Sequence, residues 1–295
     1  MAAEMTRRGF LAAAGGAAFG AFGAEAERPA LRFGIVTDCH AADIEPKGVR
    51  HYRASERKLA ECVGEMNRRG VDFLIELGDF KDQGPTAEAT LGYLRGIEGV
   101  FRGFAGPRYH VLGNHDMDCI SKAQFMGQVE NSGIGPSETF YSFDVKGLHC
   151  VVLDANFRAD GKDYEAGNFK WTEAYVPPRE LAWLADDLAA TRLPAVVFVH
   201  QLLDGDEGAQ YVRNAAEVRG VLEASRRVRA VFQGHHHAGD CRKRGAIHYY
   251  TLKALVEGAG AEDNAYAVVS ATAEGALAVE GLRRAESRTL APIPA

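Results

Sequence analysis

The sequence has few cysteines and no C-x-x-C pair. Five cysteines occur in 295 residues, and their spacing argues against a structural zinc site built on thiolates. In an oxidising compartment one disulfide is possible, but the sequence does not give its connectivity. The five are Cys39, Cys62, Cys119, Cys150 and Cys241.

The sequence also lacks an excess of basic residues. Lysine and arginine total 34 against 40 aspartates and glutamates, which gives a formal net charge of -6. A general nucleic-acid binder usually has a basic face, so no nucleic-acid partner is expected. Small anionic substrates stay possible, because bound metal ions would dominate the local electric field.

No low-complexity segment, Pro/Gly/Ser-rich linker or internal repeat divides the chain. With 46% hydrophobic residues, 295 residues can bury a large core. We therefore expect one catalytic domain at residues 31–282, followed by a tail at residues 283–295.

The N-terminus carries the signature of an export signal. Arg7 and Arg8 precede Phe10-Leu11, a small-residue apolar stretch and then Ala24-Glu25-Ala26. This order predicts a twin-arginine-like signal at residues 1–26, recognised by the twin-arginine export machinery, with cleavage after Ala26. A membrane anchor is the weaker alternative, because the stretch is short for a span of about 20 residues. We expect a periplasmic or secreted protein with no stable membrane insertion after cleavage.

Strand and helix patterns alternate from Leu31 onward. Short apolar runs ended by Gly, Asp or His predict strands, and apolar residues at helical spacing predict the helices between them. The predicted strands are 31–37, 71–77, 109–112, 140–145, 148–153, 195–199 and 228–232, with three more between 247 and 282; the predicted helices are 55–69, 86–101, 179–189 and 214–226. Strands 140–145 and 148–153 form an antiparallel hairpin in this prediction. The pattern predicts an α/β sandwich with helices outside.

Seven potential metal ligands follow the predicted strands. They are Asp38, His40, Asp79, Asn114, His200, His235 and His237. Open α/β sheets bind ligands at the carboxyl ends of their strands, so we expect these residues to converge. Oxygen and nitrogen donors without thiolates suit two divalent transition-metal ions, with Mn, Fe, Zn, Co and Ni all compatible.

Spacing assigns some of these ligands to shared ions. Side chains at i and i+2 point the same way, so Asp38 and His40 can reach one metal. The same spacing turns His235 and His237 to one side, each toward a different metal. A carboxylate has two oxygens, which makes Asp79 the expected bridge between the ions.

The Gly-Asn-His-Asp motif at residues 113–116 suggests more than metal binding. Asn114 offers a neutral oxygen to the second metal. His115 is better placed to donate a proton to a leaving oxygen, and Asp116 could fix its tautomer by a hydrogen bond. A lone histidine at the end of a strand, such as His200, is more often a satisfied core residue.

Substrate contacts are less specific in the sequence. Arg50 and Arg53 lie close enough to the first motif to contact a phosphate or ribose, although a solvated helix start explains them equally well. The long segment from Ala155 to Pro178 reads as a functional loop. Its aromatic residues could stack on a base or sugar, but packing against the sheet is favoured for them: Tyr164, Phe169, Trp171 and Tyr175.

Taken in order, the motifs D-x-H, G-D, G-N-H-D, H and G-H-x-H resemble those of the calcineurin-like metallophosphoesterases, over residues 31 to about 282. The resemblance implies a four-layer α/β/β/α sandwich. It also implies that one metal is held by Asp38, His40, Asp79 and His237, and the other by Asp79, Asn114, His200 and His235. A hydroxide between the metals would attack phosphorus, and His115 would assist the leaving group.

A closer resemblance is to the manganese-dependent ADP-ribose/CDP-alcohol diphosphatases. It is carried by residues 33–38, 50–55, 109–115 and 245–252. That branch commonly has Gln at the position of His40. In purple acid phosphatases a Tyr lies three residues after the bridging Asp; here Asp82 occupies that position, so an Fe(III)–tyrosinate centre is not expected.

The predicted function is a binuclear metal-dependent hydrolase of phosphoric esters or anhydrides. The expected substrate is a small phosphorylated molecule, such as a nucleotide-like compound, and a phosphodiester or nucleoside-diphosphate-type pyrophosphate is favoured. A phosphomonoesterase or nucleotidase is the alternative within catalysis. A non-catalytic metal-dependent binding protein is the alternative outside it.

Overall fold

The structure is a computed structural model that describes residues 31–271 and 276–290. The export signal predicted at residues 1–26 lies outside the described residues. Within the described ranges, none of the helices combines the length and apolar character needed to cross a membrane. All five cysteines are described, and each is a free thiol.

The first sheet contains six strands in the order β12-β11-β10-β1-β2-β3. Its strands are β1 (Leu31–Val36), β2 (Phe73–Glu76), β3 (Arg108–His110), β10 (Ala265–Ala271), β11 (Leu277–Arg283) and β12 (Arg288–Leu290). Strands β1, β2 and β3 are parallel, and β10 pairs antiparallel with β1. The chain's last strands therefore flank its first one.

Two helices connect the parallel strands and cover the outer face of this sheet. They are α1 (Ser55–Arg69) and α2 (Ala87–Phe101), the ranges that the sequence predicts to within one residue. Helix α1 buries Leu59, Cys62 and Met66 on one face, as its apolar spacing requires. The Thr86 side chain accepts a hydrogen bond from the Ala89 amide and so caps the start of α2.

The second sheet also contains six strands, in the order β4-β5-β6-β7-β9-β8. Its strands are β4 (Tyr141–Val145), β5 (Leu148–Val152), β6 (Ala195–Val199), β7 (Val228–Gln233), β8 (Asp240–Arg244) and β9 (Ile247–Thr251). The predicted β4–β5 hairpin is confirmed, and its turn residues Lys146 and Gly147 both have positive φ. Helices α4 (Pro178–Ala190) and α5 (Ala215–Ser225) cover the outer face.

Four short elements complete the described chain. They are helix α3 (Lys122–Met126) and the 3-10 turns η1 (Tyr52–Ala54), η2 (Asn114–Met117) and η3 (Trp171–Glu173). Of these, η2 contains three of the predicted site residues, Asn114, His115 and Asp116, and η3 lies on the long segment between β5 and α4.

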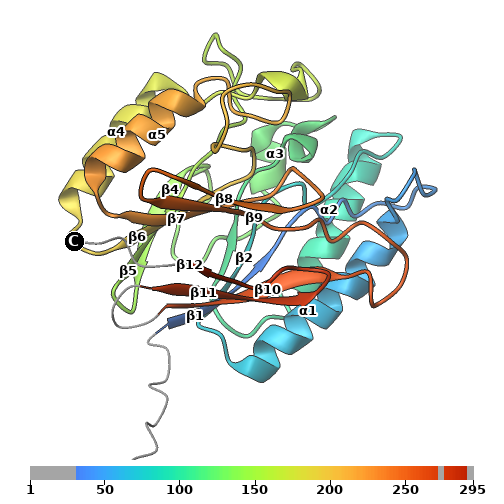
Figure 1. The fold of residues 1–295 in the computed structure, drawn as a ribbon. Coiled ribbons are helices and arrows are strands. Elements are labelled where there is room, and N and C mark those ends of the chain that lie inside the picture. The colour runs from blue at the N-terminus through green and yellow to red at the C-terminus, as the bar shows by residue number, and fades with distance from the viewer. Residues whose placement is uncertain (1–30, 272–275, 291–295) are drawn as a thin grey trace, which may run out of the picture.

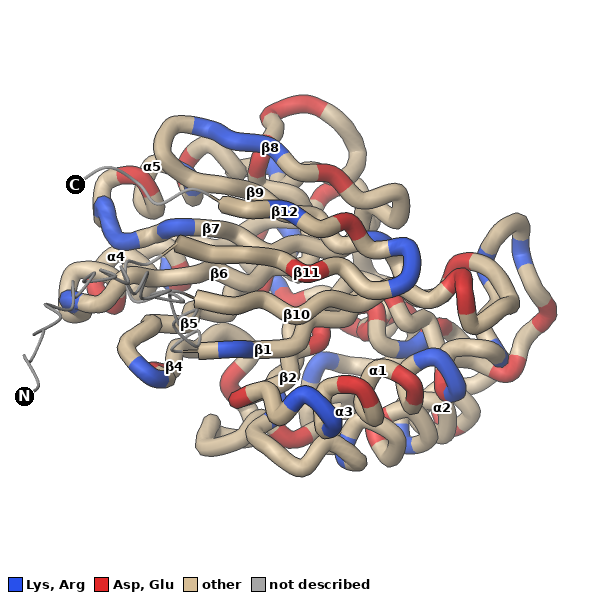
Figure 2. The backbone as a smooth tube through the Cα atoms, turned by 60° about the horizontal axis from the view of Figure 1, so that its bottom comes forward, with Lys and Arg blue, Asp and Glu red and all other residues tan. Residues whose placement is uncertain are grey.

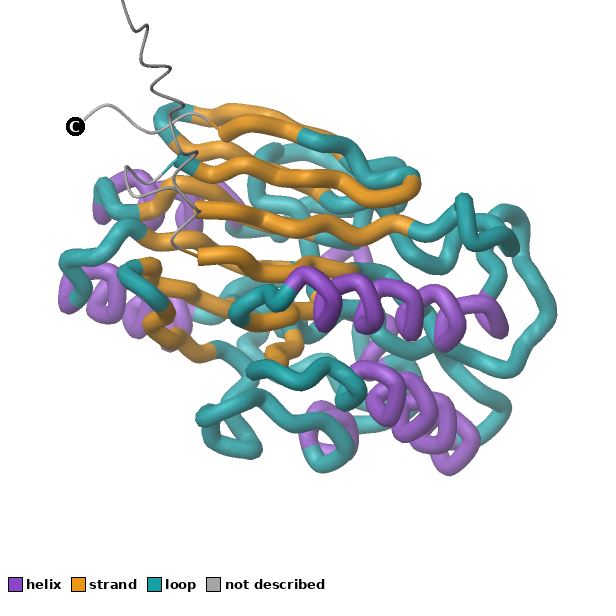
Figure 3. Tube along the Cα trace, turned by 90° about the horizontal axis from the view of Figure 1, so that it is seen from below, coloured by secondary structure: helices purple, strands orange, loops and turns teal. Residues whose placement is uncertain are grey.

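Three apolar cores hold the layers together. The core between the sheets includes Phe33 and Phe73 from one sheet and Phe198 and Phe232 from the other, with edge-to-face ring contacts across it. One further core joins α1 and α2 to the first sheet, and another joins α4 and α5 to the second. Figures 1 and 3 show the resulting layers, with helices outside and strands inside. The predicted four-layer α/β/β/α sandwich is confirmed.

Two strands were absent from the sequence prediction. The sequence of β8, Asp-Cys-Arg-Lys-Arg, is polar because β8 is an edge strand with one neighbour, β9. Strand β12 lies in the segment predicted as tail, and its pairing with β11 extends the first sheet to Leu290. The predicted domain end at residue 282 thus falls inside β11, whose last residue is Arg283.

Charges of both signs are mixed over the described part of the chain. Figure 2 shows lysine and arginine positions interspersed with aspartate and glutamate positions along the tube. This distribution agrees with the balance of charges in the sequence.

Candidate metal centre

The predicted ligands lie together where parallel strands of both sheets end. Asp38 follows β1, Asp79 follows β2 and Asn114 follows β3 in the first sheet. His200 follows β6, and His235 and His237 follow β7 in the second. The two sheets are tied at this edge, because the Asp38 carboxylate accepts a hydrogen bond from the His235 amide at 3.0 Å. Residues separated by up to two hundred positions therefore share one site.

Four of these residues have backbones in the left-handed region. The φ values are 51° for Asp38, 46° for His40, 55° for Asp79 and 65° for His235. This conformation is uncommon for residues other than glycine and tends to cluster at functional sites. Four of the eight non-glycine residues with positive φ in the described ranges thus lie in this site, where the strained backbone aims their side chains.

Two motif glycines allow the strand ends of the first sheet to touch. A Cβ atom on Gly113 would lie 2.1 Å from the Asp79 amide nitrogen, and one on Gly78 would lie 2.7 Å from the Gly113 nitrogen. Any side chain at these positions would push Asp79 away from the Asn114 turn. The glycines that mark the motifs are therefore required by backbone contact.

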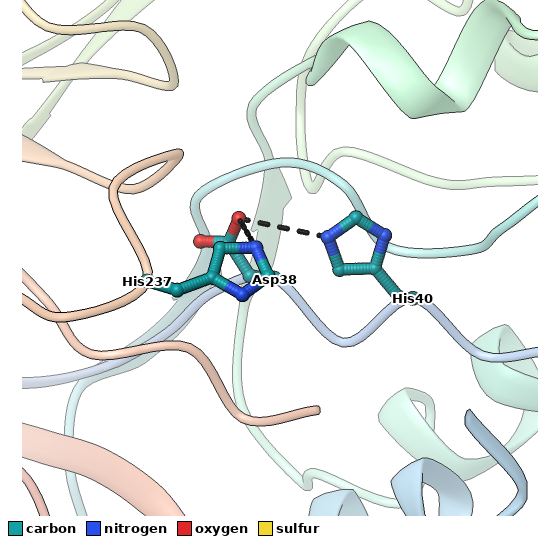
Figure 4. Close-up of side chains that lie close together, drawn as sticks. All are labelled: Asp38, His40 and His237. Carbon is teal, nitrogen blue, oxygen red and sulfur yellow. Dashed lines mark ion pairs between the residues drawn. The ribbon is translucent and has the colours of Figure 1, made fainter. Parts of the chain in front are cut away.

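One group of potential ligands, which we call the first cluster, comprises Asp38, His40 and His237 (Figure 4). His237 Nε2 lies 3.3 Å and His40 Nε2 3.8 Å from the same oxygen, Asp38 Oδ1. The other ring nitrogens contact carboxylates: His40 Nδ1 lies 3.2 Å from Asp82, and His237 Nδ1 lies 3.2 Å from Glu257. Such outer carboxylates fix the tautomer, leaving Nε2 free to face a cation.

The second cluster comprises Asp79, His200 and His235. His200 Nε2 lies 3.1 Å from Asp79 Oδ2 and 3.2 Å from His235 Nδ1. The other nitrogen of His200 bonds the Leu77 carbonyl at 2.7 Å. His200 is thus buried and satisfied on one side, as a core histidine would be, while its second nitrogen faces the cluster.

Asp79 lies between the two clusters. Its Oδ2 atom is 3.1 Å from His200 Nε2 and 3.5 Å from His40 Nε2, while Oδ1 accepts the His115 amide at 2.8 Å. One carboxylate oxygen can therefore reach both groups of imidazoles. This is the geometry that the bridging prediction requires.

Orphaned polar atoms test whether cations fit here. Among the described residues, buried polar atoms without a hydrogen-bond partner include Asp38 Oδ1, His40 Nε2, Asn114 Oδ1 and His235 Nε2. Each such atom costs about 1–3 kcal/mol when unsatisfied. All four belong to predicted ligands and all four are lone-pair donors in the right tautomer, so a pair of divalent cations fits the donor set.

Electrostatics lead to the same conclusion. Burial opposes ionisation of Asp79, but the neighbouring imidazoles of His200 and His115 outweigh it and hold its pKa well below the usual range. Burial also disfavours charged imidazoles, yet the carboxylates raise the pKa of His40 to about 10 and of His200 to about 9. The carboxylates thus create a strongly negative potential that favours bound cations, which would displace these protons.

His115 lies beside both clusters with a different partner from the one predicted. Its Nδ1 lies 2.8 Å from Asp118 Oδ2. The prediction that Asp116 fixes the His115 tautomer is wrong. Asp116 instead accepts hydrogen bonds from the amides of Gly113, Asp79 and Phe80, and so braces the backbone beneath the site. Burial opposes protonation of His115, but the charge of Asp79 and the bond to Asp118 raise its pKa.

A cavity of about 570 Å³, which we call the metal cavity, opens over the clusters. Its lining includes Asp79, Asn114, His115, His235 and His237, together with Arg50, Trp171, Gln210 and Glu257. Arg50 is where the substrate-binding prediction needs it. Arg53 is not: its guanidinium pairs with Asp43 at 2.5 Å and Glu45 at 2.7 Å on the exposed loop before η1.

The aromatic residues of the long loop divide between packing and the site. Tyr164 is fully buried and stacks on Phe169 with ring centres 4.0 Å apart, as the packing prediction requires. Trp171 lies instead at the metal cavity, 5.7 Å from the His235 ring. Sequence reasoning singled out Trp171 but favoured packing for it, and it missed Asp118, which contacts His115 within the same turn, and Glu257, whose partner His237 lies on another loop.

Comparisons with known proteins agree with this geometry. A family model described as "Calcineurin-like phosphoesterase" matches residues 31–239. A "Manganese-dependent ADP-ribose/CDP-alcohol diphosphatase" from Oryza sativa subsp. japonica is 26% identical over 282 residues, covering 81% of this chain and 87% of the relative. A "Probable cyclic nucleotide phosphodiesterase" from Fibrobacter succinogenes is 24% identical, covering 72% of this chain and 75% of the relative.

A solved structure shares the fold closely. The crystal structure of a dimetal phosphatase from Danio rerio superposes with a TM-score of 0.77 at 19% sequence identity. The match covers 89% of this chain and 99% of that one. The likeness therefore extends over nearly the whole described chain, including strands beyond residue 239.

Proposed function

The chain belongs to the calcineurin-like phosphoesterase family, and on that premise we propose that it hydrolyses a phosphodiester or a diphosphate rather than a phosphomonoester. The family is one of binuclear metal phosphoesterases, so hydrolysis of a phosphate ester or anhydride is its shared chemistry. The finer choice of substrate rests on the site.

The observation that carries the proposal is the position of Asp79 between the clusters. We assign one cation to Asp38, His40, His237 and Asp79, and the other to Asp79, His200, His235 and Asn114. When bound, such a pair neutralises charge on the phosphoryl group and makes a water molecule more acidic.

The protein's own groups then act on the substrate around the cations. His115 uses Nδ1 to bond Asp118, which leaves Nε2 free to give a proton to the departing oxygen. Arg50 lines the same cavity and supplies a positive charge for a second anionic group. Asp116 holds the amides of Asp79 and Gly113 in place, so its role is to position the site rather than to react.

The relatives support the diester or diphosphate choice. The rice protein is named for ADP-ribose and CDP-alcohols, which both contain a diphosphate, and the Fibrobacter protein is named for cyclic nucleotides, which are diesters. For the same reason we propose manganese as the preferred metal. The donor set by itself also accepts Fe, Zn, Co or Ni.

Matched assays test the proposal. The purified protein, stripped of metal and reloaded separately with Mn²⁺, Zn²⁺, Fe²⁺, Co²⁺ and Ni²⁺, is assayed on bis(p-nitrophenyl) phosphate, p-nitrophenyl phosphate, ADP-ribose and a cyclic nucleotide. We expect the highest kcat/KM on a diester or diphosphate with Mn²⁺. A preference for p-nitrophenyl phosphate would make the protein a phosphomonoesterase. Binding of two cations without turnover of any substrate would favour the binding-protein alternative.

Export by the twin-arginine pathway is a separate proposal supported by Arg7, Arg8 and the Ala24–Ala26 site. Replacing both arginines with lysine should retain the protein in the cytoplasm of an expressing bacterium, measured by cell fractionation. Equal amounts in the exported fraction before and after the change would reject it.

A further inference from the structure

One large aromatic side chain at the metal cavity is half exposed. Trp171 has 46% of its surface accessible, and Val49 is the other large hydrophobic residue exposed in the described ranges. Keeping an indole ring in water forgoes the free energy of burying it. The Trp171 ring, which lies beside His235, is therefore better placed to contact a bound ligand than to stabilise the loop by packing.

The loop that carries Trp171 is fixed to the catalytic turn. The amides of Ala166 and Gly167 donate to the carbonyls of Ile120 and Met117, the residues just after the Asn114–His115 motif. Tyr164 stacks on Phe169 and bonds the Lys170 carbonyl. Because the backbone that carries the ring is held in position beforehand, little backbone entropy is lost when a ligand binds to the ring.

Trp171 lines two cavities that share residues of the candidate site. One is the metal cavity. The other, which we call the side cavity, measures about 480 Å³ and is lined by Gln83, Asp118, Phe169, Lys170 and Thr172. Asn114, His115 and Trp171 line both. A phosphorus atom beside His115 thus has room for one substituent on each side of the indole.

We propose that Trp171 is a stacking platform for a planar aromatic ring, such as a nucleobase, that one arm of the substrate places in the side cavity. This inference rests on the proposed function and names the class of substrate more closely. The site would accept phosphodiesters or diphosphates in which one arm ends in such a ring.

The linings of the two cavities explain which arm goes where. The metal cavity contains Arg50 and Glu257 and the imidazoles of both clusters, which suit phosphate and sugar hydroxyls. The side cavity offers two aromatic rings, Phe169 and Trp171, and the neutral amide of Gln83. An aromatic face with a nearby amide is suited to a base, whose flat side stacks while its edge forms hydrogen bonds.

The experiment compares two ligands that differ by the ring alone. Binding of AMP and of ribose 5-phosphate to the Mn²⁺-loaded full chain is measured by calorimetry. We expect wild type to bind AMP about 10-fold more tightly, within the range measured for stacking of a base on an aromatic side chain. In Trp171→Ala the preference should fall below about 2-fold, with the affinity for ribose 5-phosphate unchanged.

Fluorescence provides a second readout. The chain has two tryptophans, so Trp183→Phe leaves Trp171 as the sole reporter. AMP should quench its emission, and ribose 5-phosphate should not. Trp171→Phe should keep part of the preference for AMP, because a smaller aromatic face remains. Val49→Ala is the matched control: it removes the other exposed hydrophobic side chain and should leave the preference at the wild-type value.

An unchanged preference for AMP in Trp171→Ala, or quenching by both ligands alike, would overturn the inference. Assays of wild type on bis(p-nitrophenyl) phosphate and ADP-ribose separate this failure from that of the proposed function. Turnover of either substrate together with an unchanged AMP preference refutes the platform alone. If wild type turns over neither substrate while Trp171→Ala loses the preference for AMP, the proposed function is refuted and the stacking platform is supported.

Discussion

The two ligand clusters differ in the groups that contact the outer ring nitrogens of their histidines. In the first cluster, His40 and His237 are each backed by a carboxylate, Asp82 and Glu257. In the second, His200 is backed by a neutral backbone carbonyl. Burial and the charge of His200 lower the pKa of His235 to about 3, so that imidazole is neutral. The clusters look alike as ligand lists, but the first carries more negative charge.

This difference predicts unequal metal affinities. Anionic partners raise the basicity of ligating imidazoles, and extra negative charge attracts a cation more strongly. We expect the first cluster to retain its cation when the second has lost its own. The following changes test this comparison, beginning with the largest expected effect.

Asp79→Ala should remove the cations from both clusters, so that no difference in metal affinity between them remains. Because Asp79 Oδ2 faces histidines of each cluster, both cations should be lost, and activity should fall by at least about 10³-fold. Elemental analysis after gel filtration measures the metal content, with Asp43→Ala at the surface as control. Two equivalents still bound would show that Asp79 is not the bridge.

His115→Ala should separate catalysis from metal binding. His115 belongs to neither cluster in our assignment, so the metal content should match wild type while kcat falls by roughly 10²–10⁴-fold. Asp118→Asn should give a smaller loss, since it removes only the charge that acts on His115 Nδ1. If kcat stayed at the wild-type value in His115→Ala, its role as proton donor would be rejected.

Glu257→Gln should weaken the first cluster alone. Loss of the charge behind His237 is expected to lower the affinity for the first cation by about 10–100-fold and to leave the second unchanged. Stepwise Mn²⁺ titration by calorimetry measures both affinities. Glu88→Gln, on the exposed face of α2, is the control. Equal weakening of both affinities would contradict the asymmetry.

His149 offers a comparison with a histidine that has no free ring nitrogen. Its nitrogens contact Asp187 at 2.8 Å and Asp144 at 2.6 Å, and the hydrogen bond to Asp187 raises its pKa above the usual value despite burial. The contacts of protonated His149 with Asp187 and Asp144 therefore stabilise the folded state fully below about pH 6.5, the usual pKa of an unfolded histidine. This stabilisation is lost as the pH rises through the higher pKa of His149 in the folded state.

His149→Gln should reduce that pH dependence. Between pH 5.5 and 9, wild type is expected to lose about 1 kcal/mol more unfolding free energy than the variant. Urea unfolding at the two pH values measures the difference, and chelation of metal should leave it unchanged. A larger loss in the variant would reverse the sign and reject the assignment.

Much of the metal centre could be predicted because its signals are local. Each ligand follows an apolar run that is long enough for one buried strand, and parallel strand ends meet at one edge. The glycines at positions 78 and 113 stand in the motifs, and the structure shows that both allow a close backbone contact. Alternation of side chains predicted that His235 and His237 turn to the same side, and the ligand sets implied by the family resemblance assigned them to different metals, as the two clusters do.

The misses arise where geometry depends on turns and partners that spacing does not reveal. Residues three apart share a face of a 3-10 turn, so η2 and the residue after it bring Asp118, not Asp116, to His115. Arg53 forms ion pairs with Asp43 and Glu45. The sequence does not reveal these pairs, because it does not give the conformation of the loop that carries the two carboxylates. The polar strand β8 depends on backbone pairing with β9, and a polar sequence gives no sign of it.

The order of strands in the first sheet also constrains how the centre can form. Strand β1, which leads into Asp38 and His40, lies between β2 and β10, and β10 begins only at Ala265. During synthesis, the neighbour on one side of β1 emerges about two hundred and thirty residues after β1 itself. Such distant pairing is slow to form. A ribosome-bound fragment that ends before β10 should therefore bind neither cation stably. Metal uptake should then follow the synthesis of β10.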